Sequence, residues 1–474
     1  MKYSIVKNSK IDLGDRIDAE YFEPSYLENE NRLKKVDAKP LSCFSKLTSS
    51  AFYPSATEYY ATGEMPFIRC VDCIDFYAIT SLQAETFEKL PHIFIKENKT
   101  IKKLNDGDIV ITKVGSPCFA SVIYGLGEVA LSRTVLGVYE IKGIDPLYLT
   151  VFLRSKYGFE QLVRERELTI QYQLTLNRVG RILIFKPTNE SFEKIIRELF
   201  IKSQQLHTSA VGMYRQAEQI LLSELNLLMW KPKHSLSFIK NYSDIQTTLR
   251  IDAEYFQPKY EDIVKEIKKY KEGYGLLGEL VSIKDKNVVP EDESAYKYIE
   301  LANISTNGNI TGFTESLGHE LPTRARRKVR TGDILVSSIE GSLSSIALIN
   351  APLNNALCST GFYVIDSEAI NSETLLVLLK SKVGQLQLKK GCSGTILTAI
   401  SKGELKKVIV PKISGKIQDI VKTKITEMYK AKFVSDELFN IAKRGVELAI
   451  EKDEPQAQKW INEELKRIGI TISK

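Results

Sequence analysis

The chain has 474 residues, of which 43% are hydrophobic and 26% are charged, a composition that is ordinary for a soluble globular protein. This length is too great for one compact core, and about two to four domains are expected. The formal net charge of +7, from 66 basic and 59 acidic residues, is compatible with a polyanionic partner without requiring one.

Location is predicted from what the sequence lacks. No stretch approaches about 18 uninterrupted apolar residues, which excludes a membrane-spanning helix. The first segment, MKYSIVKNSKIDLGD, has no apolar core of the kind found in signal peptides. The six cysteines lack the spacing of a disulfide framework, which suits a reducing compartment. We therefore expect a cytoplasmic protein without a membrane partner.

The first element along the chain is a string that occurs twice. RIDAEYF occupies residues 16–22 and again 250–256, inside the longer matches DRIDAEYFEPSY and LRIDAEYFQPKY. Further echoes follow in the same order in both halves. They are DGDIVI and TGDILV, the pairs Gly115-Ser116 and Gly341-Ser342, FLRSKYG and LLKSKVG, and RILIFKP and KKVIVPK. Self-similarity at this period predicts a duplication of half the chain.

Two segments of similar size lie between these markers, at about 30–187 and 265–411. Both contain short β-rich runs, such as MPFIRCV and GDILVSSI, that are interrupted by Gly, Pro, Asn and Asp. Each also contains a helical stretch, PLYLTVFLRSKYGFEQLVRE in the first and SETLLVLLKSKVGQLQLKK in the second. A mixed α/β (α+β) fold is predicted for both.

A long helical run follows each segment. In the first run, apolar and small residues step by alternating threes and fours from Phe192 to Leu227, as in a coiled-coil seam. A second stripe in the same phase runs from Ile417 to Gly445 and is richer in small residues. The matched phase favours two helices packed on each other, whereas the alternative is two amphipathic helices that cover separate cores.

The order of these elements predicts the architecture. Two globular units would be joined and separated by an antiparallel two-helix coiled coil, with a pseudo-two-fold internal repeat. Such a chain can contact two half-sites on a DNA duplex. A first unit is expected at 1–188, a central spacer helix at 189–231, a second unit at 232–412, and a C-terminal spacer helix with a tail at 413–474.

These residues resemble the specificity (S) subunit of type I restriction-modification systems over essentially the whole chain. The resemblance rests on the R-x-D-A-E-Y-F-x-P-x-Y string at the head of each half, the variable α/β segment and the closing long helix. One departure is the absence of a GSTQ-like turn, because the corresponding segments read CSGTILT and LTIQYQLT.

The resemblance implies a function in host defence. Each α/β segment would be a target recognition domain that reads one half of a bipartite, asymmetric site in double-stranded DNA. The helices would act as a ruler and would dock two methyltransferase (M) subunits, with restriction (R) subunits in the full complex. This chain would hold no cofactor, and S-adenosylmethionine, ATP and Mg would be bound on the partner subunits.

The doubled string is interpreted as a scaffold and partner-docking element. Its Ile, Tyr and Phe side chains and the following prolines suit a packed corner, and its charged side chains suit buried or interfacial pairing. The candidate residues are Arg16, Asp18, Glu20, Tyr21 and Phe22 with their copies Arg250, Asp252, Glu254, Tyr255 and Phe256.

Clustered cations are the candidate DNA contacts. The segment TRARRKVR holds five cations that repel one another unless an anion neutralises them, and the matching place in the first half, KENKTIKKLND, is also basic. Lys113, Arg133 and Ser338 are further candidates outside these two segments. The set is Lys96, Lys99, Lys102, Lys103, Lys113, Arg133, Arg324, Arg326, Arg327, Lys328, Arg330 and Ser338.

No catalytic motif is convincing. GYGLLG has the spacing of a dinucleotide loop but follows a lysine-rich helical run rather than a strand. Cys70 and Cys73 lack a second pair of ligands for zinc. No N-P-P-aromatic string and no P-loop occur. A non-enzyme is therefore predicted. The alternatives are a structural adaptor with protein-binding domains and a fused restriction-methylation enzyme.

Overall fold

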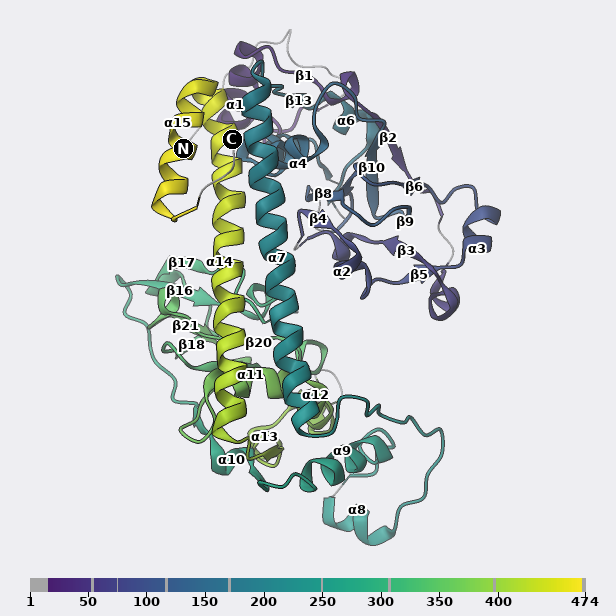
Figure 1. Ribbon diagram of the computed structural model, residues 1–474, viewed down its shortest axis with the longest axis vertical. Coiled ribbons are helices and arrows are strands. Elements are labelled where there is room, and N and C mark those ends of the chain that lie inside the picture. The colour runs from purple at the N-terminus through teal and green to yellow at the C-terminus, as the bar shows by residue number, and fades with distance from the viewer. Residues whose placement is uncertain are drawn as a thin grey trace. The chain divides into compact units, whose positions relative to one another are not determined.

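The computed structural model describes residues 16–470, apart from 53–54, 75, 116–117, 169–171, 249, 306–307 and 395–397. The chain forms two compact units, and Figure 1 follows their elements by colour along the chain. Unit 1 comprises Met1–Thr208 and Ala431–Lys474, and unit 2 comprises Ser209–Lys430. Both divisions fall inside long helices. No helix among the described residues is long and apolar enough to cross a membrane.

Unit 1 contains two main β-sheets, with strand orders β2-β10-β7-β8-β4 and β5-β3-β9-β6. The pairs β4–β8 and β3–β9 are parallel, and the other pairs in these sheets are antiparallel. Two-stranded pairs β1–β13 and β11–β12 lie outside them. The strands are β1 (Lys39–Pro40), β2 (Lys46–Ser49), β3 (Met65–Ile68), β4 (Ala78–Ile79), β5 (Lys89–Leu90), β6 (Lys103–Leu104), β7 (Ile109–Thr112), β8 (Ala120–Ile123), β9 (Val129–Leu131), β10 (Val135–Tyr139), β11 (Glu167–Leu168), β12 (Tyr172–Gln173) and β13 (Leu183–Ile184).

The echo DGDIVI explains why β7 lies at the centre of its sheet. All four strand residues are buried, as expected of a strand covered on both faces. Ile109 and Ile111 pack in the core that includes the helices, while Val110 between them packs in the core between the two sheets. The helices of this half are α1 (Pro24–Lys35), α2 (Ser81–Ala84), α3 (His92–Glu97), α4 (Pro146–Arg154), α5 (Lys156–Arg164), α6 (Leu176–Arg181) and α7 (Glu190–Glu224).

Unit 2 repeats this topology, except that its described residues contain no strand corresponding to β4. Its two four-stranded sheets have the orders β15-β22-β19-β20 and β17-β16-β21-β18, and β16–β21 is the parallel pair that corresponds to β3–β9. The smaller pairs recur as β14–β25 and β23–β24. The strands are β14 (Tyr274–Leu276), β15 (Ser282–Lys284), β16 (Ala295–Ile299), β17 (Thr314–Leu317), β18 (Ala325–Lys328), β19 (Ile334–Ser337), β20 (Ile346–Leu348), β21 (Leu357–Ser359), β22 (Phe362–Asp366), β23 (Cys392–Ser393), β24 (Ala399–Ile400) and β25 (Ile409–Pro411).

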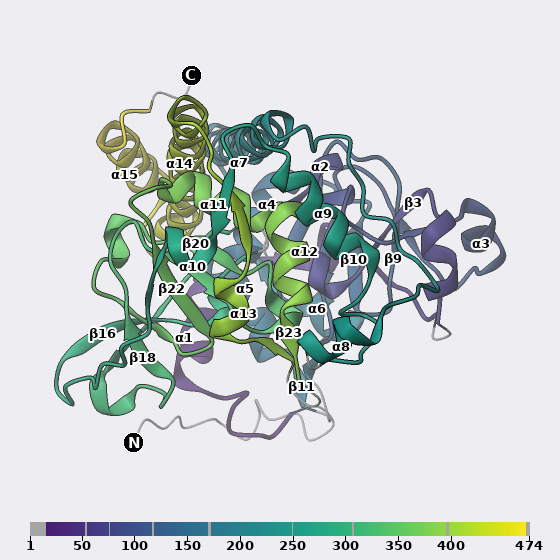
Figure 2. The same ribbon diagram turned by 90° about the horizontal axis from the view of Figure 1, so that it is seen from below.

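The helices recur as well. In unit 2, α9 packs along α12 (Figure 2), as α1 packs along α5 in unit 1. The remaining helices are α8 (Tyr242–Thr248), α9 (Pro258–Lys268), α10 (Leu277–Leu280), α11 (Ser372–Lys380), α12 (Lys382–Lys390), α13 (Lys402–Lys406), α14 (Gly415–Glu451) and α15 (Glu454–Arg467). The predicted mixed α/β class is thus confirmed, and the sequence echoes mark equivalent places in two copies of one fold.

The echo FLRSKYG and LLKSKVG marks a sharp corner between two nine-residue helices. Ser155 and Ser381 are buried at the two corners, and each Oγ donates to the carbonyl three residues earlier, at 2.6 and 2.8 Å. A Cβ atom on Gly158 would lie 2.2 Å from the Phe152 carbonyl oxygen, and Gly384 is equally confined. Glycine is therefore required there, because the second helix crosses the end of the first.

The two long helices pack on each other in antiparallel fashion within each unit. In unit 1, Ser203 and Ser435 donate reciprocally to each other's carbonyl oxygen at 2.7 and 2.8 Å. Further along, a Cβ atom on Gly445 would contact Ile196. In unit 2, α7 and α14 line one shallow groove that includes Ile220 and Ile417. The predicted pairing of the long helices is confirmed.

The C-terminal segment, for which a spacer helix with a tail is expected, contains two helices. Helix α14 ends at Glu451, and α15 begins with Pro455 in its first turn and Asp453 as its N-cap. The fixed φ of proline suits a helix start but not a helix interior. In unit 1, Ala457 and Ile461 of α15 are buried in the same core as α7 and α14.

Candidate scaffold and nucleic-acid interface

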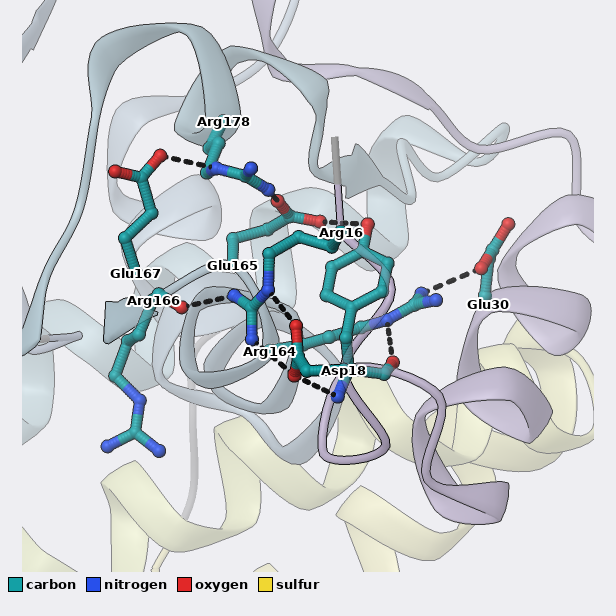
Figure 3. A network of polar contacts seen from close by, with 9 residues as sticks. Arg16, Asp18, Glu30, Arg164, Glu165, Arg166, Glu167 and Arg178 are labelled. Carbon is teal, nitrogen blue, oxygen red and sulfur yellow. Dashed lines mark hydrogen bonds and ion pairs between the residues drawn. The ribbon is translucent and has the colours of Figure 1, made fainter. Parts of the chain in front are cut away.

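The first copy of the doubled string folds around its own aspartate. Arg16 pairs with Asp18 through two nitrogens, and the Tyr21 amide donates to the same carboxylate at 3.0 Å. The Nη1 atom of Arg16 donates to the carbonyl of Arg166, two residues beyond the end of α5. Figure 3 shows this contact beside Glu165, Arg164 and Arg178. The string therefore fixes the start of the hairpin that follows α5.

The second copy makes the same contacts. Arg250 donates to the two oxygens of Asp252 at 2.7 and 2.9 Å, and the Tyr255 amide donates to that carboxylate at 3.0 Å. The Nη1 atom of Arg250 donates to the carbonyl of Cys392 at 2.9 Å. Cys392 is two residues beyond the end of α12, which is the place that Arg166 occupies after α5. Seven identical residues thus produce one local structure twice.

Each tyrosine of the string is in contact with two cations. The Arg16 and Arg164 guanidinium carbons lie 5.1 and 4.1 Å from the centre of the Tyr21 ring. In unit 2 the corresponding groups are Arg250, at 4.3 Å from the Tyr255 ring, and the Lys390 ammonium, at 4.9 Å. Arg164 and Lys390 are the last residues of α5 and α12. Cation–π contacts therefore attach the string to equivalent helix ends.

The arginines also set the charge of the string. The hydrogen bond from Arg16 lowers the pKa of Asp18 to about 2, and the bond from Arg250 likewise lowers the pKa of Asp252. In unit 1 the network continues from the Tyr21 hydroxyl, which donates to Glu165 at 2.9 Å, to Arg178, which pairs with Glu165 at 3.2 Å. Both aspartates therefore remain ionised at neutral pH as acceptors for their own turns.

The outer face of the string differs from the expected packed corner. Ile17 and Ile251 are 69% and 84% exposed, so the isoleucine does not pack into either unit. Glu20 and Glu254 are exposed beside them, although Glu20 lies 3.5 Å from Arg166 and Glu254 pairs with Lys259 at 3.0 Å. Phe22 is half-buried and Phe256 is buried. Each string therefore exposes Ile, Ala and Glu, holds Arg and the aromatic residues partly or fully buried, and leaves Asp about half exposed.

The candidate cations of unit 1 lie on adjoining segments. Lys102 donates its backbone N–H to the Ser50 hydroxyl at 2.8 Å, and its carbonyl accepts from Leu131 at the end of β9 at 2.9 Å. Arg133 follows two residues later and is exposed. Lys96 and Lys99 are exposed, in α3 and just after it, and Lys103 on β6 pairs with Glu128 at 2.7 Å. The structure thus brings Lys102, Lys103 and Arg133 together at the edge formed by β6 and the end of β9.

The cations of unit 2 lie on and around β18 and have different surroundings. Arg324, Lys328 and Arg330 are exposed. Arg326 is half-buried and donates to the Thr323 carbonyl at 3.0 Å. Arg327 is also half-buried, donates to the Phe362 carbonyl, and lies 5.6 Å from the Tyr363 ring. Arg327 is therefore directed into the unit rather than toward solvent.

Strand register places the two basic segments at equivalent positions. Lys103 is paired with β9 as Lys328 is paired with β21, and each precedes a buried apolar residue and then a glycine with positive φ. These glycines, Gly107 and Gly332, have φ of 85° and 93° and begin the turn that enters β7 or β19. The sequence match of the two basic segments is thus also a match of position in the fold.

Sequence reasoning missed the partners of the string. Arg164, Glu165 and Arg178 in unit 1, and Lys390 in unit 2, complete the cation–π and ion-pair contacts. The available signal was a charged run at the end of each predicted helix, RERE in one half and KK in the other. The glycines of GYGLLG lie in and around β14 and the short helix α10. Cys70 and Cys73 are both buried.

Comparisons with known proteins give partial likenesses. No family model and no curated protein matches the chain. The HsdS subunit from Thermoanaerobacter tengcongensis is 25% identical, with a TM-score of 0.30, over 37% of this chain and 46% of that one, less than half its length. The S subunit of a type I restriction-modification system from M. genitalium is 11% identical, with a TM-score of 0.37, over 92% of this chain and 96% of that one.

A third chain comes from a structure titled for the complex assembly and conformational transition of the type I R-M system. It is 15% identical over 74% of this chain and 83% of that one, with a TM-score of 0.26. The solved structures that this chain is similar to therefore include S subunits, the class of protein that the doubled string resembles. The residues and contacts of the chain itself remain the basis for its function.

Proposed function

We propose that the chain is the non-catalytic DNA-specificity subunit of a type I restriction-modification complex. Each unit would read one half of a bipartite, asymmetric DNA site. The observation that carries the proposal is the pairing of one repeated frame with two different sets of surface cations. The anchors of the two units agree, and so do the orders of the strands that they share. The exposed cations differ, because they are Lys99, Lys102 and Arg133 in unit 1 but Arg324 and Lys328 in unit 2.

Two units with one fold and different surface side chains suit the reading of an asymmetric DNA site. Phosphate contacts from Lys and Arg position a protein on DNA, and contacts to base edges supply specificity. Two units with the same fold approach a duplex in equivalent ways, while their differing side chains select different bases. The exposed cations at matched strand positions provide the phosphate-binding part of this scheme in both units.

The partners would dock where the two units are alike. Each string presents an exposed isoleucine, an exposed alanine and a glutamate in the same local structure. Two equal surfaces on one chain suit two copies of one partner, and these would be the methyltransferase subunits. The helices α7 and α14 extend through both units and would set the separation of the half-sites. Cofactors for methylation and translocation would be bound by the partner subunits.

The test is reconstitution of the full-length chain with its methyltransferase subunits, followed by methylation-site sequencing of host DNA. We expect a bipartite motif that requires this chain. Methylation or cleavage by the chain alone, or heat on titration with S-adenosylmethionine in a calorimeter, would overturn the non-catalytic role. An adaptor that binds proteins instead of DNA would show no steep loss of DNA binding between low and moderate salt.

A further inference from the structure

Lys113 in unit 1 and Ser338 in unit 2 occupy the same position in the repeated fold. Each residue directly follows the central strand of its sheet, which is β7 in unit 1 and β19 in unit 2. The backbone N–H of Lys113 donates to the Thr134 carbonyl at 2.9 Å, and that of Ser338 donates to the Gly361 carbonyl at 2.9 Å. Both acceptors lie just before the next strand of the sheet, β10 or β22.

The other side of this position is also fixed by the backbone. The Lys113 carbonyl accepts from Leu174 at 3.0 Å, and the Ser338 carbonyl accepts from Ile400 at 2.8 Å. Leu174 directly follows β12, and Ile400 ends β24, so each is at the end of the hairpin that the doubled string anchors. Equivalent main-chain hydrogen bonds therefore hold Lys113 and Ser338 at the same position of their respective units, and the two positions differ in the side chain.

The two side chains offer opposite hydrogen-bonding groups. The Ser338 hydroxyl donates to the Gly361 carbonyl at 2.8 Å. Its proton is thus used, and its oxygen lone pairs remain as acceptors. The Lys113 ammonium carries three donors and no acceptor. Its contact to a described residue is the Ser49 hydroxyl at 3.3 Å, so donors remain available.

The charge of Lys113 is not balanced within the described part of unit 1. The residue is half-buried, and burial lowers the pKa of its ammonium. No described carboxylate forms an ion pair with Lys113, in contrast to Lys103, which pairs with Glu128. A partly desolvated ammonium without an anion is unfavourable, which favours a role in binding.

The surroundings of Lys113 connect it to the candidate DNA-binding edge. Its ammonium contacts Ser49, and the next residue, Ser50, accepts the Lys102 N–H at 2.8 Å. Its backbone is bonded to Thr134, the neighbour of Arg133. Lys113 therefore lies where the basic segment, the end of β9 and the anchored hairpin meet, behind the more exposed cations Lys102 and Arg133.

We infer that Lys113 and Ser338 are the paired specificity-determining residues of the two units, which read base edges in their respective half-sites. This inference rests on the proposed function. The donor-only Lys113 fits an edge of two acceptors, for which the O6 and N7 atoms of guanine are the best match in the major groove. Ser338, with its proton used internally, accepts from the exocyclic amino group of cytosine or adenine.

The test is an exchange of the two side chains in the full-length chain, read by methylation-site sequencing beside active methyltransferase subunits. In Lys113→Ser, we expect one guanine position in one half-site to lose its preference while the other half-site is unchanged. In Ser338→Lys, we expect one position in the other half-site to shift toward guanine. Discrimination against the wrong base, measured by anisotropy with duplexes, should change roughly tenfold or more.

Two further variants separate base reading from other roles. Lys113→Arg retains donors for guanine and should keep the motif, whereas Lys99→Ser removes an exposed cation and should weaken binding to all sequences equally. An unchanged motif in Lys113→Ser with evenly weakened binding would make Lys113 a phosphate contact and overturn the inference. Unchanged DNA binding in Lys113→Ser would also overturn the inference, because Lys113 would then make no contact with DNA. If Lys113→Ser fails to fold, Lys113→Gln takes its place, because an amide in a base-reading position should move the preference from guanine toward adenine.

The proposed function fails in a different way. A wild-type chain that directs no bipartite motif would overturn that proposal before any variant is compared. A wild-type bipartite motif with no response at the exchanged positions would overturn only the assignment of Lys113 and Ser338.

Discussion

The Nη1 atom of Arg250 donates to the carbonyl oxygen of Cys392 at 2.9 Å, across 142 residues of sequence. Arg16 makes the same contact with Arg166 across 150 residues. In both units the bond joins the start of the repeated string to the first residues of a hairpin. The doubled string therefore stabilises a long-range junction in each unit in addition to forming its own turn.

Loss of this junction should lower the stability of mainly the unit that contains it. We expect Arg250→Ala to lower the unfolding free energy of unit 2 by about 1–3 kcal/mol, because the charged hydrogen bond and the ring contact are lost. The half-exposed pair with Asp252 adds little to this value. Hydrogen exchange should increase at β23 and β24 and not at β11 and β12. Arg16→Ala, the matched control, should show the reverse pattern.

Acid should weaken the first string in a defined pH range. The folded pKa of Asp18 is about 2, below its ordinary value of 3.8. Its contribution to stability is therefore complete above about pH 4 and is lost as the pH falls through 2. Asp18→Asn should lower the stability at neutral pH and reduce the dependence on pH between 4 and 2. Denaturant unfolding at several pH values measures both effects, and parallel curves for the two proteins would contradict the prediction.

The helix corners should not tolerate a methyl group. In Gly158→Ala the new Cβ would lie 2.2 Å from a backbone oxygen, and we expect a loss of about 3 kcal/mol or more. Gly212 in α7 has no atom within 4 Å of its ideal Cβ, so Gly212→Ala is the matched control. Because alanine favours helix, that change should stabilise the chain by up to about 1 kcal/mol. Thermal and urea unfolding of both variants test this difference.

The cations of unit 2 should divide into two classes. Alanine at Arg324, Lys328 or Arg330, which are exposed, should weaken DNA binding to all sequences and lower the salt slope by about one per lost phosphate contact. Arg327→Ala should lower the stability of unit 2, because its guanidinium is bonded to the Phe362 carbonyl. Salt titrations of DNA binding, with unfolding measured in parallel, separate the classes. A stable Arg327→Ala protein with a reduced slope would reverse this assignment.

The length of the helical pair should set the spacing of the half-sites. Because α7 and α14 are antiparallel, an insertion must be made in both, after Thr208 and after Lys430, to keep the seam paired. Four residues in each add roughly 6 Å. This distance corresponds to about one or two base pairs of unread spacer, since B-DNA rises about 3.4 Å per base pair. Methylation-site sequencing should show the same half-sites with a longer spacer, and an unchanged spacer would remove the ruler role.

The repeat in the fold was predictable because its markers are residues with strict local requirements. Gly158 and Gly384 fill corners that admit no Cβ, and Asp333 is buried at the entrance to its strand. Such positions keep their identity when the rest of the unit changes. The spacing of buried positions along α7 by threes and fours, as at Phe192, Ile196, Leu199 and Ser203, likewise follows from the pairing of two helices.

The rest of the site depended on contacts that sequence patterns do not record. The exposure of Ile17 could not be read from the string, because an apolar residue in a turn is buried or exposed according to which elements pack over it. The echo DGDIVI and TGDILV aligns Lys113 with Ser338, but only the backbone contacts show that both residues hold equivalent places beside the anchored hairpin. The start of α15 had a signal in Pro455, which lies beyond the end of the predicted apolar stripe at Gly445.

The main-chain bonds at Lys113 and Ser338 have a consequence for how such a protein diversifies. Because the backbone N–H and carbonyl hold the position, most replacements of the side chain leave the frame intact. Proline is the exception, because it has no N–H to donate. Under the inference that this position reads bases, selection could alter the recognised sequence by single codon changes here, without compensating mutations in the core.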